Sequence, residues 1–155
     1  IMNIPAESTA KFSKGERIVS RRQIEKLFGG GNRSMAAYPV RMVYMSMSRA
    51  SHDEAVQVLV TVSKRHFKHA VRRNRVKRQL REAYRANKHL LYDVLQHMPD
   101  RSLALAFIWQ SDRLYDSTEV AFAMESLLRR LSERLIRQLH VQVVDEVRLA
   151  EEDGL

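Results

Sequence analysis

The amino-acid sequence predicts a single α+β domain, a sandwich of few layers in which helices cover a small sheet. Two segments alternate apolar and polar residues with the period of a strand, and a third is almost continuously apolar. Three other segments place apolar residues at helical spacing. The order along the chain is therefore helix, strands, helix, strand, helix, without internal repeats or a low-complexity linker.

The first helix is predicted over residues 21–28, where Ser20 can cap the amino terminus. Residues 29–31 are all glycine, which is costly to hold in a helix, and they end it. Its apolar side consists of Ile24, Leu27 and Phe28.

Two strands are predicted next. Residues 38–47 alternate, with Val40, Met42 and Tyr44 on one side, and residues 56–62 carry a valine at every second position. The polar residues 49–54 between them are typical of a hairpin loop. We therefore expect these two strands to be joined as a hairpin.

A parallel pair of strands is expected around the second helix. A turn containing Pro99 precedes residues 103–109, whose continuous apolar character is typical of a central strand. A strand, a crossover helix and a returning strand in one sheet lie side by side in parallel. Residues 56–62 and 103–109 are predicted to pair in this way.

The last helix is predicted to start at Asp116, with Glu119 three residues on in the relation of a capping box. Its outward side mixes both signs of charge, which indicates a solvated surface, and residues 145–153 are predicted to be an acidic, frayed tail. The outward residues are Arg129, Arg130, Glu133, Arg134 and Arg137. The core-facing stripe is Val120, Met124, Leu127, Leu128, Leu131 and Leu135.

Composition favours a polyanionic partner. The 155 residues carry a formal charge of +9, and 45% of them are apolar, enough for one domain to bury a core. Residues 1–100 hold 20 basic and 8 acidic residues (+12), whereas residues 101–155 hold 7 and 10 (−3). Cysteine is absent, which excludes disulfides, and no secretory signal or membrane-spanning run is found, so a soluble cytoplasmic protein is expected.

The positive charge concentrates in residues 64–85, which contain ten Lys or Arg and one acid, Glu82. On an ideal helix, at roughly 100° per residue, Arg78, Arg81 and Arg85 gather with Asn74 on one side. Like charges four residues apart repel, so the segment favours a phosphate-rich partner that neutralises them. A solvated basic face and a membrane-surface helix are the alternatives. The apolar side of the helix is Val76, Leu80, Ala83 and Tyr84.

Three stretches of this region resemble the signature of the bacterial ribonuclease P protein subunit. They are Val62-Ser63-Lys64-Arg65, then Ala70-Val71-Arg72-Arg73-Asn74-Arg75-Val76-Lys77-Arg78, then Arg81-Glu82-Ala83-Tyr84. The resemblance covers roughly residues 11–138. It implies an α-β-β-β-α-β-α sandwich like ribosomal protein S5 domain 2, in which the basic helix is the crossover.

The resemblance also implies a function. Such subunits bind a large catalytic RNA, ribonuclease P RNA, and the 5′ leader of precursor tRNA, and they promote Mg²⁺-dependent endonucleolytic removal of the leader. The RNA carries the chemistry and holds most of the Mg²⁺. No catalytic or metal-binding residue is then expected in the protein, which acts as a monomer in the holoenzyme and is inactive alone. The chain is expected to be one RNA-binding domain, residues 1–155, with an ordered core over about 11–140 and a flexible N-terminal segment.

Site residues follow from the motif. The resemblance implies that the leader lies between the first helix and the sheet, against Ile24, Phe28 and Tyr44, where aromatic rings can stack on extruded bases. Ile24 and Phe28 could instead be core residues. The residues expected to bind RNA are Lys64, Arg65, Lys68, Arg72, Arg73, Asn74, Arg75, Lys77, Arg78, Arg81 and Arg85.

Two other functions remain open at this point. A basic ribosomal or RNA-chaperone module would explain the charge but not the motif. A metal-dependent nuclease would need clustered acids beside the basic helix, where only Glu82 occurs. His66 and His69 have a metal-compatible spacing, but no neighbouring Cys or carboxylate completes a site.

Overall fold

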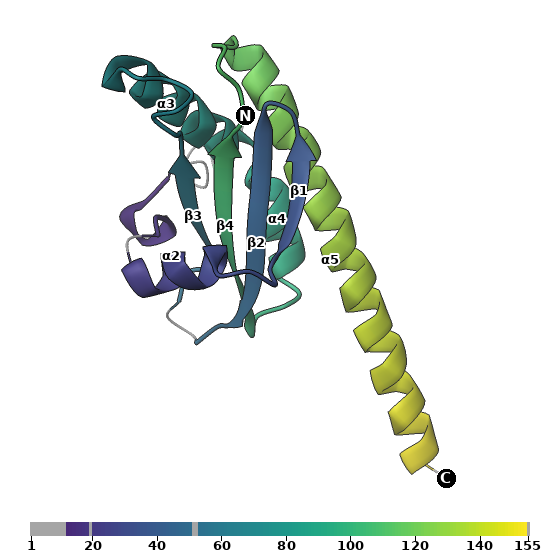
Figure 1. The fold of residues 1–155 in the computed structure, drawn as a ribbon. Helices are drawn as coiled ribbons and strands as arrows, with labels where there is room; N and C mark the ends of the chain where they lie inside the picture. The colour runs from purple at the N-terminus through teal and green to yellow at the C-terminus, as the bar shows by residue number, and fades with distance from the viewer. Residues whose placement is uncertain (1–11, 19, 51–52, 155) are drawn as a thin grey trace.

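The computed structural model describes residues 12–18, 20–50 and 53–154 (Figure 1). The N-terminal segment predicted to be flexible lies outside the described residues. The elements are a 3₁₀ turn η1 (Lys14–Glu16), α2 (Arg21–Phe28), β1 (Arg33–Ala37), β2 (Val40–Ser48), β3 (Val56–Thr61), α3 (Ala70–Asn87), α4 (His89–Leu95), β4 (Arg101–Trp109) and α5 (Ser117–Asp153). In the described part of the chain, no helix is long and apolar enough to cross a membrane.

The four strands form one sheet in the order β1-β2-β4-β3. Strands β3 and β4 pair in parallel, which confirms the arrangement predicted around the basic helix. The predicted hairpin between β2 and β3 is wrong, because β4 lies between them and pairs with both. The hairpin of this fold joins β1 to β2 instead, and its turn contains the cis peptide bond Tyr38-Pro39.

The apolar pattern of the sequence does not predict strand β1, although the family resemblance implies it. Its sequence, RSMAA, is short, and only Met35 and Ala37 are half-buried, so it carries almost no apolar alternation. The segment becomes a strand because β2 offers it a free edge, and main-chain pairing needs no apolar side chain.

Helices cover both faces of the sheet (Figure 1). The larger core lies between the sheet and α3, α4 and α5, and it includes Met42, Leu105 and Phe107 from the strands. The smaller core lies under α2, where Leu27 and Ile18 pack on Ala104 and Ala106 of β4. Because successive side chains of a strand point to opposite faces, β4 supplies both cores and is almost wholly buried.

Helix α2 has the predicted bounds. The backbone N–H of Gln23 donates to Ser20 Oγ at 3.3 Å, which satisfies one of the free donors of the first turn. At the other end, the Asn32 side-chain amide donates to the carbonyl oxygens of Lys26 and Leu27 at 2.8 and 2.7 Å. Gly30 and Gly31 follow with φ of 91° and 79°, a conformation that favours glycine, and they turn the chain into β1.

Helix α5 begins as predicted, with Asp116 and Glu119 forming a reciprocal capping box. The predicted core stripe from Val120 to Leu135 is buried. The frayed tail expected over residues 145–153 is not what the structure shows, because α5 continues through Asp153. Neither Gly nor Pro occurs between residues 117 and 153, so nothing in the backbone stops the helix before Gly154.

A buried ion pair connects the N-terminal part of the chain to the helices. The Lys88 ammonium lies 3.0 Å from each carboxylate oxygen of Glu16, and the hydroxyl of Tyr92 donates to Oε2 of Glu16 at 3.2 Å. Lys88 is the residue between α3 and α4, a junction that sequence analysis did not predict. The pair holds η1 beside the carboxyl end of the basic helix.

Candidate nucleic-acid interface

Helix α3 presents a cationic surface to solvent. The residues predicted to pack on the core, Val76, Leu80, Ala83 and Tyr84, are buried, so the opposite side of the helix must face outward. The exposed members of the predicted set are Lys64, Arg65, Lys68, Arg72, Asn74, Arg75, Arg78 and Arg81, whereas Arg73, Lys77 and Arg85 are half-buried.

Part of this surface is a hollow beside the N-terminal segment. Asn74, Arg78 and Arg81 of α3 line it together with Phe12 and Arg17. The guanidinium of Arg17 lies over the Phe12 ring, 5.4 Å from its centre, in the geometry of a cation–π contact. The ring of Phe12 packs edge-on against Tyr84 at 5.6 Å, which anchors this wall of the hollow to the core.

Charge in the hollow is partly compensated at one end. Arg85 lies 2.6 Å from the Glu82 carboxylate, whose pKa is lowered mainly by its hydrogen bond with Arg85. Within the described residues, Arg78 and Arg81 have no carboxylate partner. The centre of the hollow therefore keeps an unneutralised positive charge that a phosphate group could compensate.

Arg73 has a different environment from its neighbours in the motif. Its guanidinium donates to the carbonyl oxygens of Phe67 and Lys68, both at 2.8 Å. The helical wheel places this residue over the apolar stripe, and the side chain avoids burial of its charge by reaching back around the helix amino terminus. Arg73 thus holds the loop that precedes α3.

The two histidines do not form a metal site. His66 Nδ1 lies 2.7 Å from a carboxylate oxygen of Asp112, which ties the loop before α3 to the loop after β4, and His69 is the N-cap of α3. Within the described residues, no group of three His, Asp or Glu side chains could hold a metal ion.

Around α2 the structure forms a second candidate surface, and it is apolar. Phe28 is 45% exposed at the end of the helix, and Ile24 is half-buried beside the smaller core. Three residues of β2, namely Val43, Met45 and Met47, share this face of the sheet and are also half-buried. Unpaired bases could stack or pack here without hydrogen-bond readout.

Tyr44 does not belong to this surface, so the prediction that it lines one groove with Ile24 and Phe28 is wrong. It lies on the opposite face of the sheet, in the larger core, and only 8% of its surface is exposed. Its hydroxyl accepts a hydrogen bond from Arg134 of α5 at 2.5 Å. Strand alternation groups Tyr44 with Val40 and Met42 and places Val43 and Met45 on the other face, but it does not say which of the two faces α2 covers.

Comparison with known proteins gives the same assignment as the motif. The sequence profile described as Ribonuclease P matches residues 12–132. A "Ribonuclease P protein component" from Porphyromonas gingivalis is 44% identical over 133 residues, covering 84% of this chain and 92% of the relative. A protein of the same description from Chlorobium phaeobacteroides is 33% identical over 130 residues, covering 83% and 87%. This chain belongs to the ribonuclease P protein family.

Solved structures of ribonuclease P proteins share the fold. The Thermotoga maritima protein has a TM-score of 0.55 at 21% identity, with 74% of this chain and 96% of that chain covered. A mutant of the Staphylococcus aureus protein has a TM-score of 0.58 at 17% identity, with 84% and 98% covered. The α+β fold class is confirmed, and membership of the family connects this chain with tRNA processing as a ribonuclease P protein component.

Proposed function

We propose that this chain binds the catalytic RNA of ribonuclease P through the exposed cations of α3 and promotes removal of the 5′ leader from precursor tRNA. The observation that carries the proposal is the hollow in which Arg78 and Arg81 stand without carboxylate partners among the described residues, beside Asn74 and Arg17. Arginine forks at such a surface bind phosphate oxygens and release counterions from the RNA.

The proposed leader contact is the apolar surface around α2. Phe28 offers an exposed ring, and Ile24, Val43 and Met45 offer half-buried aliphatic contacts beside it. Stacking on a ring tolerates any base, which suits leaders whose sequence varies from one precursor to another. This surface and the cations of α3 would let one small protein hold both RNAs.

Chemistry is assigned to the RNA partner. The acid within α3, Glu82, is paired with Arg85, and the residues that the structure describes do not fit a Mg²⁺ site built from protein carboxylates. In the proposal, Mg²⁺ is held mainly by the RNA, and the protein binds and positions. We further propose that one copy of the chain acts in each holoenzyme, in the cytoplasm, where tRNA precursors are made.

The test is cleavage of a labelled precursor tRNA at low Mg²⁺ by a bacterial ribonuclease P RNA, such as that of Porphyromonas gingivalis, with and without this protein. We expect stimulation only when RNA and protein are combined, and no cleavage by the protein alone. Cleavage by the pure protein would show a nuclease instead. Failure to stimulate, with retained binding to other structured RNAs, would favour a ribosomal or chaperone module.

A further inference from the structure

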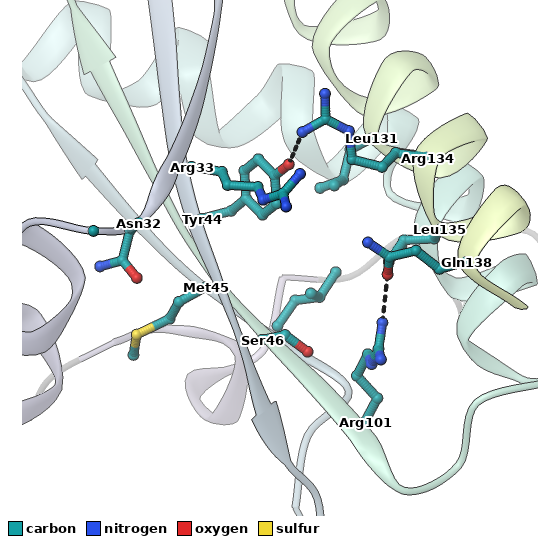
Figure 2. Close-up of a pocket in the computed structure, with 12 residues that line it drawn as sticks. Asn32, Arg33, Tyr44, Met45, Ser46, Arg101, Leu131, Arg134, Leu135 and Gln138 are labelled. Atoms are coloured by element: carbon teal, nitrogen blue, oxygen red, sulfur yellow. Dashed lines mark hydrogen bonds between the residues drawn. The ribbon is translucent and has the colours of Figure 1, made fainter. Parts of the chain in front are cut away.

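A second group of arginines surrounds a pocket on the side of the sheet away from α2 (Figure 2). The pocket lies between β2 and α5 and has a volume of about 220 Å³. Arg33 of β1, Arg101 of β4 and Arg134 of α5 line it, and Arg137 joins Arg33 and Arg134 around an adjoining hollow. We call these four residues and the space between them the arginine pocket.

The pocket exists because β1 is shorter than β2. Strand β1 starts only at Arg33, which pairs with Tyr44, so residues 45–48 of β2 have no strand partner on that edge among the described residues. Opposite residues of an antiparallel pair point to the same face, which places the Arg33 side chain beside Tyr44 and under α5. The free edge of β2 adds unpaired main-chain groups to one wall.

The positive charge of the pocket is not compensated. Among the residues that the structure describes, no Asp or Glu lines the pocket or the adjoining hollow. Arg134 donates to the Tyr44 hydroxyl at 2.5 Å, and Arg101 donates to Gln138 Oε1 at 2.6 Å, as Figure 2 shows. These partners are neutral, so they orient two guanidinium groups without reducing their charge.

Several like charges around one pocket repel each other, and an anion relieves that repulsion. Arg134 and Arg137 are three residues apart on α5, a rise of about 4.5 Å along the axis, so the cations extend beyond one anion site. A chain of phosphates fits this arrangement better than a single small anion. The residues that line the pocket place it at the β1/β2 edge of the sheet. Helix α3 begins beyond β3 at the other edge (Figure 1), so the two cationic surfaces are separate.

We propose that the arginine pocket binds the phosphate backbone of RNA, as a contact separate from α3. The inference rests on the proposed function, because it takes the ligand to be one of the two ribonuclease P RNAs. The shared chemistry is a backbone phosphate, which either the catalytic RNA or the precursor tRNA can supply. Arginine forks from two sides of the pocket would clamp its oxygens.

The test compares the double variant Arg33→Gln/Arg137→Gln with the wild-type protein. The single variant Arg148→Gln is the matched control. Arg33 and Arg137 are both exposed, so their replacement should preserve the fold, and melting curves check this. Arg148 is exposed on the same helix, about 16 Å further along the axis from Arg137. Two affinities are measured by titration at several salt concentrations. The first is that of the protein for the catalytic RNA, and the second is that of the assembled holoenzyme for precursor tRNA.

We expect the double variant to bind one of the two RNAs about tenfold more weakly, with a log-log salt slope smaller by about two. Arg148→Gln should match wild type, and Arg33→Lys/Arg137→Lys should recover most of the affinity. A loss with the catalytic RNA assigns the phosphate to that partner, and a loss only with precursor tRNA assigns it to the substrate.

Equal affinities and slopes for the double variant and Arg148→Gln, with both RNAs, would overturn the inference. That result is distinguishable from failure of the proposed function. If wild type stimulates cleavage and the double variant behaves as the control, only the arginine pocket is excluded. If the wild-type protein itself does not stimulate cleavage, the proposed function is excluded, whatever the double variant does.

Discussion

The guanidinium of Arg73 bends back to the loop before α3, whereas those of Arg78 and Arg81 stand in an open hollow. All three residues belong to one basic motif, and sequence position alone makes them equivalent. Their surroundings separate a residue that supports the fold from residues free to bind a partner.

Replacing Arg73 with Gln should lower the free energy of unfolding by about 2 kcal/mol, because two charged hydrogen bonds to main-chain carbonyls are lost. Urea denaturation measures this, and Arg72→Gln, at an exposed neighbour, should leave stability nearly unchanged. If the Arg73 variant keeps its stability but binds RNA more weakly, Arg73 contacts RNA and does not act mainly by stabilising the fold.

Phe28 and Tyr44 are both aromatic, yet only Phe28 presents its ring to solvent. We expect Phe28→Ala to reduce the preference for precursor over mature tRNA by about tenfold, the equivalent of one lost stacking contact. Tyr44→Phe should keep that preference, since Tyr44 lies on the other face of the sheet.

The measurement is the ratio of holoenzyme affinities for precursor and mature tRNA. Phe122→Ala is a matched control, because Phe122 is 76% exposed on α5 and outside the surface around α2. A loss of preference in the Phe122 variant as large as that of Phe28→Ala would contradict the assignment.

At the scale of the elements, the ion pair between Glu16 and Lys88 joins parts of the chain that are far apart in sequence. Both side chains are more than nine-tenths buried, and Tyr92 completes the hydrogen bonding of the carboxylate. Removing one partner of a buried pair leaves an uncompensated charge, which costs far more than the pair itself contributes.

Lys88→Met should therefore lower the free energy of unfolding by about 3 kcal/mol, and Glu16→Leu/Lys88→Met should recover much of the loss. Urea denaturation of the two variants decides this. If the double variant is less stable than Lys88→Met, the pair does not act as an isolated buried charge pair.

Two tyrosines beside this pair make stability depend on alkaline pH. Burial raises the pKa of Tyr84 well above its ordinary value, and burial with the nearby Glu16 carboxylate also raises the pKa of Tyr92. Below pH about 10 both phenols are protonated in the folded and the unfolded chain. Above it the unfolded chain loses these protons first, so the free energy of unfolding should fall as pH rises.

Urea denaturation between roughly pH 8 and 11, the range around an ordinary tyrosine pKa, tests this expectation. The decline above pH about 10 should be shallower in Tyr84→Phe, which has one ionisable phenol fewer. A decline as steep as that of wild type would show that other groups cause it.

At the scale of the whole molecule, the charges are divided between surfaces. Helix α3 begins at the β3 edge of the sheet, and the end of α5 extends away from the sheet (Figure 1). The cations of α3 therefore lie toward one edge and the arginine pocket toward the other, whereas the end of α5 carries the acids of residues 145–153. A phosphate-rich partner would be attracted to the first two and repelled by the third, so in the proposed complex these charges would orient the protein on RNA.

Arg78→Gln/Arg81→Gln should weaken binding to the catalytic RNA and reduce the log-log salt slope by about two, one for each lost phosphate contact. Titrations of the catalytic RNA between about 50 and 200 mM salt measure it. The matched control is Arg129→Gln, at a cation that already pairs with Glu125 on α5. The same slope in the double variant and the control would remove both residues from the interface.

By itself the sequence determined the bounds of α2, the capped start of α5 with its buried stripe, and the basic surface of α3, because caps, glycine stops and helical periodicity are local in the chain. It also predicted the parallel pairing of β3 with β4. The basic motif around α3 indicated the ribonuclease P protein family, and the comparisons with known proteins confirm that family.

Only the tertiary structure decided that β4 separates β2 from β3 and that α2 covers the face of the sheet opposite to Tyr44. It alone gathered Arg33, Arg101 and Arg134 from three elements around one pocket. These features depend on which strand edge is free and on which helix covers each face. Such choices are set by packing between distant segments, and no local pattern of residues records them.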